Sequence, residues 1–165
     1  MNYFHELSAG EQHVVQTLTL ERMRVCAQSG LRSRKQSEGS DEGVWTKGFG
    51  GELAFCQIFN IYPDLTSDIR SAEKGTDRPD ARLITGRAVD VKTTRWGGDL
   101  NITRWHKPVP DALFALMEEH YPKYQFVGFI DQVDALVPAN LVDGPNGQYY
   151  RVKRENLLSY IDIGL

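Results

Sequence analysis

Two segments in the first third of the chain carry apolar residues at the spacing of an α-helix. Ser8 and Glu11 have the form of a capping box, in which each side chain accepts a hydrogen bond from the backbone of the other at a helix start. The residues after them predict a helix up to about Cys26. From about Lys47 to Asn60, a glycine-rich start followed by an apolar stripe predicts a second helix. The stripe consists of Leu53, Cys56 and Phe59.

Between residues 80 and 105 the pattern changes to short runs in which apolar and polar residues alternate. Residues 80–84 and 87–93 predict two strands joined around Thr85 and Gly86, as in a β-hairpin. Residues 100–105 alternate well enough to predict a third strand.

The last third of the chain predicts one more helix and one interior strand. Pro110 suits the first turn of a helix, which we expect to end near Tyr121 with Ala112, Leu113, Leu116 and Met117 on one face. The nearly continuous apolar run 125–130 is typical of an interior strand. Shorter elements are predicted to follow: strands at 135–137 and 148–152, and a helix at 154–160.

Length and composition indicate a single domain that spans residues 1–165. The chain is 41% apolar, which is enough for a core of its own. Residues 28–43 are rich in serine, glycine and charge, which predicts a mobile loop. Cys26 and Cys56 lie in predicted helices without metal-ligand spacing, as expected of reduced, buried thiols. Without a signal peptide or a membrane-length apolar run, we expect a cytoplasmic protein with no membrane partner.

The formal net charge is −3, but basic residues are concentrated in one region. Residues 87–107 contain five basic and two acidic residues, a local charge of +3, whereas residues 111–165 contain four basic and eight acidic residues, a local charge of −4. This distribution argues against a protein covered all over with nucleic-acid-binding charge. It leaves one basic region in the middle of the chain.

That region contains the most informative residues, Asp90 and Lys92. Side chains two residues apart on a strand share a face, so this carboxylate and this ammonium lie side by side while Val89 and Val91 face the core. If Asp80 on the preceding strand reaches the same place, two carboxylates and a lysine converge. Such a group is suited to a hard cation with a proton-handling amine beside it.

The hairpin register decides whether Asp80 can join them. A two-residue turn at Thr85 and Gly86 would pair Asp80 with Val91, and Asp80 would then point away from Asp90. A three-residue loop that includes Arg87 would pair Asp80 with Lys92. We therefore predict a loop of odd length, or a bulge or bend, in this hairpin.

A helix beginning Gly48-Phe49-Gly50-Gly51-Glu52, then Asp80, then Asp90-Val91-Lys92, follows the pattern of a known family. Over about residues 47–130 the chain resembles the PD-(D/E)xK nuclease superfamily. The predicted order of helix, three strands, helix and strand is that family's αβββαβ core. The resemblance implies an α/β, restriction endonuclease-like fold with a mixed central sheet flanked by helices, to which an N-terminal helix and short C-terminal elements are added.

The resemblance also implies a role for each residue. Asp80, Asp90 and the backbone carbonyl of Val91 would be ligands of Mg²⁺ or Mn²⁺, and Glu52 would be a ligand of a second ion. Lys92 would orient the attacking water or help to deprotonate it. Phosphodiester hydrolysis needs these functions, because charge on the phosphate must be neutralised and a water activated. The implied activity is metal-dependent cleavage of DNA, by an endonuclease rather than an exonuclease.

Each of these residues has a plainer interpretation. Asp90 and Lys92 can form a solvated ion pair on an exposed strand, and a glutamate such as Glu52 is favoured in a first helical turn by the helix dipole alone. Asp77 competes with Asp80 for the same role. A different class of function, a catalytically silent module that binds nucleic acid or assembles with partners, would keep the fold without turnover.

Further residues are candidates for contact with DNA, either because they extend the strand of Lys92 or because they are basic. These are Thr94, Arg95, Arg104 and Lys107, together with Arg34 and Lys35 of the predicted loop. Trp96, Trp105 and His106 lie beside basic residues and could stack on bases or belong to the core. Tyr149 and Arg151 belong to a small aromatic and basic cluster that equally suits a strand edge. A homodimer is compatible with the family resemblance.

Overall fold

The computed structural model of the chain describes residues 3–29, 40–63 and 79–163. Its main sheet has five strands in the order β1-β6-β5-β3-β2. The strands β3 and β5 are parallel and the other neighbours are antiparallel, so the sheet is mixed. Their bounds are Phe4–Glu6 (β1), Ala81–Arg82 (β2), Ala88–Arg95 (β3), Leu113–His120 (β5) and Lys123–Asp131 (β6).

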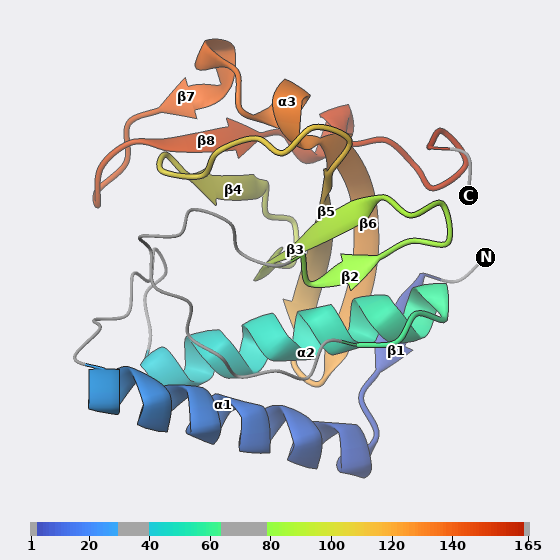
Figure 1. Ribbon diagram of the computed structural model, residues 1–165, viewed down its shortest axis with the longest axis vertical. Helices are drawn as coiled ribbons and strands as arrows, with labels where there is room; N and C mark the ends of the chain where they lie inside the picture. Colours follow the sequence, from blue (N-terminus) through green and yellow to red (C-terminus); the bar gives the residue numbers. More distant parts are fainter. Residues whose placement is uncertain (1–2, 30–39, 64–78, 164–165) are drawn as a thin grey trace.

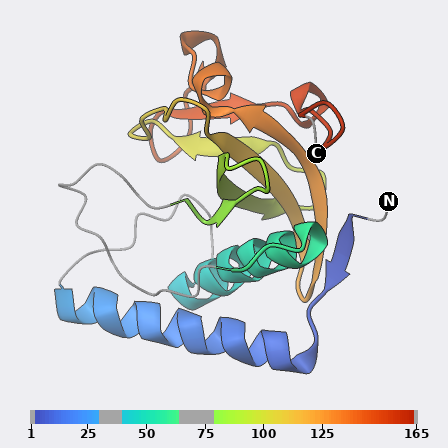
Figure 2. The same cartoon turned by 45° about the vertical axis from the view of Figure 1, so that its right-hand side comes forward.

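A second, smaller sheet has the order β4-β8-β7, with bounds Leu100–Thr103 (β4), Leu141–Val142 (β7) and Tyr149–Val152 (β8). The helices are Ala9–Ser29 (α1), Asp41–Phe59 (α2) and Gln132–Ala135 (α3), with 3₁₀ helices at Pro138–Asn140 and Arg154–Asn156. Figures 1 and 2 both show α2 next to the main sheet and α1 outside α2. The fold is therefore α/β, with a mixed sheet flanked by helices, as the sequence predicts.

Two apolar cores use opposite faces of β5. Leu113, Ala115 and Met117 pack with residues of α2 in the first core. Phe114 and Leu116 pack in the second core against the small sheet, through Leu100, Ile102 and Val152. The alternation follows from the strand period of two. The small sheet therefore covers the face of the main sheet that lies opposite α2.

The starts of both long helices follow local rules. The backbone N of Ser8 donates to Glu11 Oε2 at 2.7 Å and that of Glu11 to Ser8 Oγ at 3.3 Å, which confirms the predicted capping box. The helix α2 begins at Asp41, six residues before the predicted start, because Ser40 caps it by accepting from Gly43 N at 3.2 Å. Most of the predicted mobile loop, residues 30–39, lies outside the described residues.

The helix predicted from Pro110 is wrong, because Leu113–His120 forms the strand β5. Seven consecutive residues from Leu113 to Glu119 are buried, as expected of a strand between two neighbours and under two covered faces. Three of the residues expected on one helix face, Leu113, Leu116 and Met117, belong to this run, and their helical spacing was misleading. In addition, β4 pairs with β8 outside the main sheet. The described elements therefore do not follow the predicted αβββαβ order.

Smaller differences lie near the ends of the chain. The predicted strand 135–137 is wrong, because Ala135 ends α3 and Val137 precedes a 3₁₀ helix. Only Arg154–Asn156 is helical in the predicted segment 154–160. The strand predicted at 148–152 is confirmed as β8, and β1 and β7 were not predicted. Cys56 is buried as predicted, whereas Cys26 is only partly buried. Among the described residues, no helix has the length and hydropathy needed to cross a membrane.

A buried carboxylate ties the small sheet to the main sheet. Glu118 on β5 has a side chain only 1% exposed, and its Oε1 accepts hydrogen bonds from Arg154 Nη1 and, at 2.8 Å, from Gly97 N. The backbone N of Arg154 also donates to Asp99 Oδ1 at 3.2 Å. Three segments that are distant in sequence therefore meet at this point.

Arg154→Met is expected to lower the free energy of unfolding by about 3 kcal/mol, because it leaves the Glu118 carboxylate buried without its cation. Urea denaturation measures this change. Lys153→Met is the matched control, since Lys153 pairs with Glu155 at 3.7 Å in an exposed position worth at most about 1 kcal/mol. Equal effects of the two substitutions would contradict a structural role for the Glu118–Arg154 pair.

Candidate functional site

Two glycines let α2 approach the main sheet closely. A Cβ atom at Gly50 would lie 2.0 Å from Tyr124 Oη, and one at Gly51 would lie 2.1 Å from Thr93 Oγ1. The Tyr124 hydroxyl donates to the carbonyl of Lys47 at 3.2 Å, which fastens the same turn of α2 to β6. Close approach at this turn brings the next residue, Glu52, toward β3.

Gly51→Ala is expected to lower the free energy of unfolding by about 1–3 kcal/mol, because the new methyl group overlaps the buried hydroxyl of Thr93. Gly48→Ala on the same helix has nothing within 4 Å and should instead stabilise by about 0.5–1 kcal/mol. Thermal denaturation measures both. Thr93→Ala should partly rescue Gly51→Ala, since the Thr93 hydroxyl has no hydrogen-bond partner among the described residues. Additive effects in the double variant would contradict the proposed contact.

The β2–β3 hairpin has a loop of odd length, which confirms the prediction. Ala81 pairs with Val89, and Leu83 N donates to Arg87 O at 3.0 Å. The loop is therefore Ile84-Thr85-Gly86, one residue earlier than predicted, and Gly86 has the left-handed φ of 86° that favours glycine. If this register is continued by one residue, Asp80 lies opposite Asp90 rather than opposite Lys92. Directly opposed residues share a face, so Asp80 is on the same face as Asp90 and Lys92.

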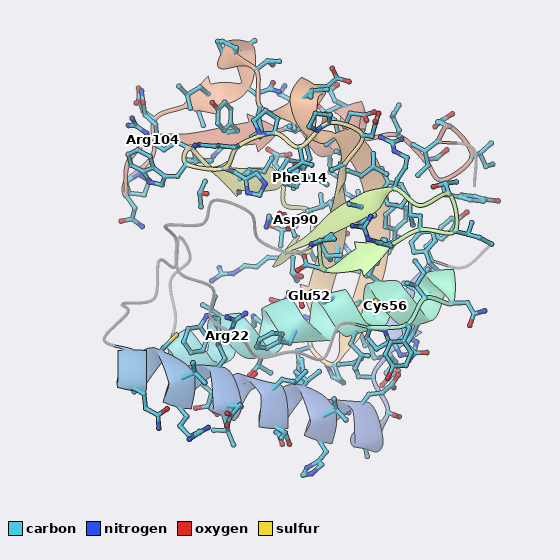
Figure 3. The ribbon with its side chains drawn as sticks, in the orientation of Figure 1. Arg22, Glu52, Cys56, Asp90, Arg104 and Phe114 are labelled. Atoms are coloured by element: carbon cyan, nitrogen blue, oxygen red, sulfur yellow. The ribbon has the colours of Figure 1, made fainter. Side chains whose placement is uncertain are left out.

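Asp90 and Lys92 form an ion pair that is largely buried. Lys92 Nζ lies 2.5 Å from Asp90 Oδ1. The side chain of Lys92 is 33% exposed and that of Asp90 is 16% exposed. The ammonium also lies 5.9 Å from the centroid of the Phe114 ring. Figure 3 shows Asp90 between Phe114 of β5 and Glu52 of α2. The arrangement differs from a solvated surface pair.

His106 is a further member of the site that the sequence did not identify. Its Nε2 lies 3.6 Å from Asp90 Oδ2, and its ring packs edge-on against Phe114 with centroids 5.0 Å apart. The sequence shows His106 beside Trp105 but has no spacing that links it to Asp90. The contact arises because the chain turns after β4, where His106 N donates to Thr103 O at 3.0 Å.

Asp80 is held at the open edge of β3. Its Oδ2 accepts a hydrogen bond from Val91 N at 2.7 Å. The N–H and C=O of one strand residue point to the same edge, so the Val91 carbonyl faces the edge where Asp80 lies. This is the position that the implied role of Val91 as a ligand requires.

Burial raises the pKa of Asp80 well above its usual range, and the carboxylates of Glu52 and Asp90 raise it further. Lys92 and the hydrogen bond from Val91 oppose this rise only in part. Glu52 and Asp90 are thus each close enough to Asp80 to repel its carboxylate. Among the described residues, Lys92 therefore compensates only part of the cost of placing a charge on Asp80.

Burial lowers the pKa of Lys92, but the attraction of Asp90 and Asp80, with smaller help from Glu52, outweighs it, so the pKa is raised overall. Lys92 therefore keeps its proton at neutral pH and acts as a cation in this state. Beneath the site, burial and then the charges of Glu52 and Asp80 raise the pKa of the Cys56 thiol to about 12, which makes it unreactive.

The donor chemistry of the site fits Mg²⁺, although the side chains are not arranged as a ligand set. Carboxylate and carbonyl oxygens are what this ion prefers, and a divalent cation would offset the charge repulsion at Asp80. Within residues 3–29, 40–63 and 79–163, no group of three or more His, Cys, Asp or Glu side chains is placed to hold a metal ion. Asp80 Oδ2 accepts a hydrogen bond from Val91 N, and Asp90 Oδ1 accepts one from Lys92 Nζ. An ion that bound to these two oxygens would displace both hydrogen bonds.

The residues that the sequence suggests for contact with DNA do not belong to the cluster of carboxylates around Lys92. Thr94 and Arg95 are at the end of β3, level with Glu118 and Glu119 of β5. Arg104 and Lys107 are exposed and follow β4. Arg34, Lys35 and Asp77 lie outside the described residues. The structure therefore brings together Glu52, Asp80, Asp90, Val91 and Lys92, with His106 added.

Comparisons of the chain with protein-family models, with curated proteins and with solved structures found no match.

Proposed function

We propose that this protein is a divalent-metal-dependent nuclease that hydrolyses phosphodiester bonds of DNA. The observation that carries the proposal is the placement of Asp80 and Asp90 at one edge of the main sheet, where Asp80 accepts from Val91 N, Lys92 pairs with Asp90, and both Glu52 and Asp90 repel the Asp80 carboxylate. Buried carboxylates that repel one another are unfavourable unless a cation compensates them. A site that cleaves phosphodiester bonds with Mg²⁺ likewise needs a bound cation to compensate its carboxylates.

When bound, Mg²⁺ or Mn²⁺ would offset charge on the phosphate and lower the pKa of a water molecule. The residues of the chain have separate tasks. Asp80, Asp90 and the Val91 carbonyl supply oxygen donors, and Glu52 supplies another from α2. Lys92 keeps its proton, so we assign it to orienting the attacking water and stabilising negative charge rather than to removing a proton. His106 Nε2 lies 3.6 Å from Asp90 Oδ2, the oxygen that Lys92 does not contact, and so helps to position this carboxylate.

The resemblance to the PD-(D/E)xK superfamily is part of this proposal. Its support lies in the order of Glu52 on α2, Asp80 directly before β2, and Asp90 and Lys92 on β3, which is the expected one. The absence of a helix between β4 and β5 in the described chain speaks against a standard version of that core. The alternative function is a catalytically silent nucleic-acid-binding or assembly module, which needs no metal at this site.

Incubation with supercoiled, linear, single-stranded and branched DNA tests the nuclease proposal. Cleavage is expected with Mg²⁺ or Mn²⁺ and is expected to stop with EDTA. Asp90→Asn keeps the shape of the side chain but removes its charge, and should reduce the rate at least about 100-fold. Asp134→Asn, on α3, is the matched control and should cut at the wild-type rate.

Metal binding separates the two functions. A nuclease is expected to bind Mn²⁺, and Asp90→Asn should weaken that binding, as measured by electron paramagnetic resonance of free Mn²⁺. A silent module need not bind the ion. Cleavage that is equally fast in EDTA, or in Asp90→Asn, would refute the assignment of this site.

A further inference from the structure

The small sheet has an outer face that is polar and aromatic. In the β4–β8 pair, Asn101 lies opposite Arg151 and Thr103 opposite Tyr149. Directly opposed residues share a face, so these four lie together. Their neighbours Leu100, Ile102 and Val152 point the other way and are buried in the second core. Asn101, Thr103, Tyr149 and Arg151 therefore face away from the main sheet.

Stacked cations and aromatic rings lie at the end of this face. The Arg104 guanidinium is 4.3 Å from the centroid of the Trp105 ring, and Arg104 Nη1 donates to Gln148 Oε1 at 3.4 Å. The Arg151 guanidinium is 5.3 Å from the Tyr149 ring and donates to its hydroxyl. Figure 3 shows Arg104 at the outer edge of the small sheet. We call these five residues, Arg104, Trp105, Gln148, Tyr149 and Arg151, the Trp105 surface.

Trp105 is 68% exposed, although a tryptophan gains most by burial. Its indole is a flat apolar surface in contact with solvent and is held by Arg104. Aromatic rings of this kind bind bases by stacking, and arginine adds cation–π and phosphate contacts. Exposure of a single ring would not establish a binding surface, so charge and position also have to agree.

The charge around the Trp105 surface favours a polyanion. Residues 100–107 and 148–154, which contain β4 and β8, include five basic residues and no acidic one, in a chain whose net charge is −3. Two of the five have acidic partners, since Arg154 is engaged by buried Glu118 and Lys153 lies 3.7 Å from Glu155. The others are Arg104, Lys107 and Arg151. Phosphate groups supply the complementary charge.

The chain connects the Trp105 surface directly to the candidate active site. Trp105 is followed directly by His106, whose Nε2 lies 3.6 Å from Asp90 Oδ2. Consecutive Cα atoms are about 3.8 Å apart. The segment that would hold a stacked base therefore continues directly to a residue that lies against Asp90.

We propose that the Trp105 surface binds unpaired bases of single-stranded DNA and leads that strand to Asp90. The inference rests on the nuclease function proposed above and specifies its substrate. In a regular duplex the faces of the bases are covered by their neighbours, so a duplex could touch this surface only through its phosphates. An unpaired strand offers both a base to stack and a phosphate to bind.

Fluorescence anisotropy with a labelled oligothymidylate of about 15 nucleotides, in EDTA to prevent cleavage, tests the proposal. The full-length protein is expected to bind the single strand more tightly than a duplex of the same length. Trp105→Ala should weaken single-strand binding by about 5- to 150-fold, since stacking one base is worth about 1–3 kcal/mol. Trp105→Phe keeps an aromatic face and should retain most of the affinity.

Trp96→Ala is the matched control. Trp96 is also exposed, at 62%, but lies before β4, whereas Trp105 follows it. Its replacement should leave binding unchanged. Equal losses in Trp105→Ala and Trp96→Ala, or tighter binding of duplex than of single strand by the wild-type protein, would overturn the proposal.

The binding experiment is independent of cleavage. Asp90→Asn should bind the oligonucleotide at least as well as the wild-type protein while cutting no strand, so failure of the nuclease function would show in the cleavage experiment and not in this one. Metal-dependent cleavage of DNA that persists undiminished in Trp105→Ala on single strands would refute the role of the Trp105 surface and leave the nuclease proposal intact.

Discussion

Lys92→Met is expected to reduce metal-dependent cleavage of DNA by about 10²- to 10³-fold, the loss typical of removing one group that stabilises negative charge in the transition state. The methionine occupies similar volume but cannot carry the charge that Asp80 and Asp90 stabilise on Lys92. The loss should appear in the rate at saturating DNA, because the lysine acts on the reacting groups. Initial rates with Mg²⁺ and with Mn²⁺ measure it.

Mn²⁺ binding should survive this substitution. Asp90 Oδ1 is engaged by Lys92 at 2.5 Å, so removing the ammonium frees an oxygen donor. The metal-free variant should melt at a lower temperature than the wild-type protein, because it leaves buried carboxylates uncompensated. Added Mn²⁺ should recover much of that stability, since an ion that binds only the folded state stabilises it.

Lys123→Met is the matched control for Lys92→Met. Lys123 is half exposed at the start of β6, and its Nζ lies 3.7 Å from Glu6 Oε2 rather than beside Asp80 or Asp90. Its replacement should leave cleavage unchanged. Lys92→Met with full activity would remove the lysine from the mechanism.

Asp80→Asn is expected to stabilise the metal-free protein while it abolishes cleavage. The Asn oxygen can still accept from Val91 N, but the variant no longer buries a charge that Glu52 and Asp90 repel. A gain of about 1 kcal/mol would raise the melting temperature by about 2–4 °C in a domain of this size. Addition of Mg²⁺ should raise the melting temperature of the wild-type protein more than that of the variant.

The pH dependence of this difference has a defined sign. The pKa of Asp80 is raised in the folded state, so the folded protein keeps a proton that the unfolded chain has released. Its stability therefore falls as pH rises from the ordinary Asp range, about 4, through the raised value. In EDTA, the advantage of Asp80→Asn should be small at low pH and grow as pH rises.

Asp162→Asn should behave in the opposite way. Hydrogen bonds from the side chain and backbone of Ser159 lower the pKa of Asp162, so its stabilising effect is present above its usual pKa and is lost as pH falls. Replacing Asp162 should lower stability at neutral pH and change nothing in acid.

If Asp80→Asn destabilises the metal-free protein at neutral pH, the charge repulsion inferred for the site is wrong.

Much of the fold could be predicted where local interactions decide the structure. The capping box of Ser8 and Glu11 depends on neighbours three residues apart, and it is present as predicted. The prediction that the β2–β3 loop has an odd number of residues is also confirmed. It followed from the strand period of two, because only an odd loop puts Asp80 on the same face as Asp90. Which residues make the loop did not follow from parity, since loops beginning at Ile84 or at Thr85 both satisfy it.

The error at Leu113–His120 has a different origin. The apolar residues of this segment occur at helical spacing, and Pro110 is a common helix start, so local signals favoured a helix. The segment became a strand because β3 and β6 hydrogen-bond to its two edges and both of its faces are covered. Pairing with strands that are distant in sequence cannot be deduced from a window of eight residues.

The sequence by itself determined which chemical groups this protein has available: three carboxylates, one lysine on the same strand as Asp90, and a close-packing glycine pair before Glu52. It determined this because strand and helix periods set the face on which each side chain lies. Only the tertiary structure decided that His106 contacts Asp90 and that Arg104 and Trp105 lie beside Gln148, Tyr149 and Arg151. Those contacts come from the pairing of β4 with β8 in a separate sheet, a long-range choice made by the burial of apolar residues on its inner face.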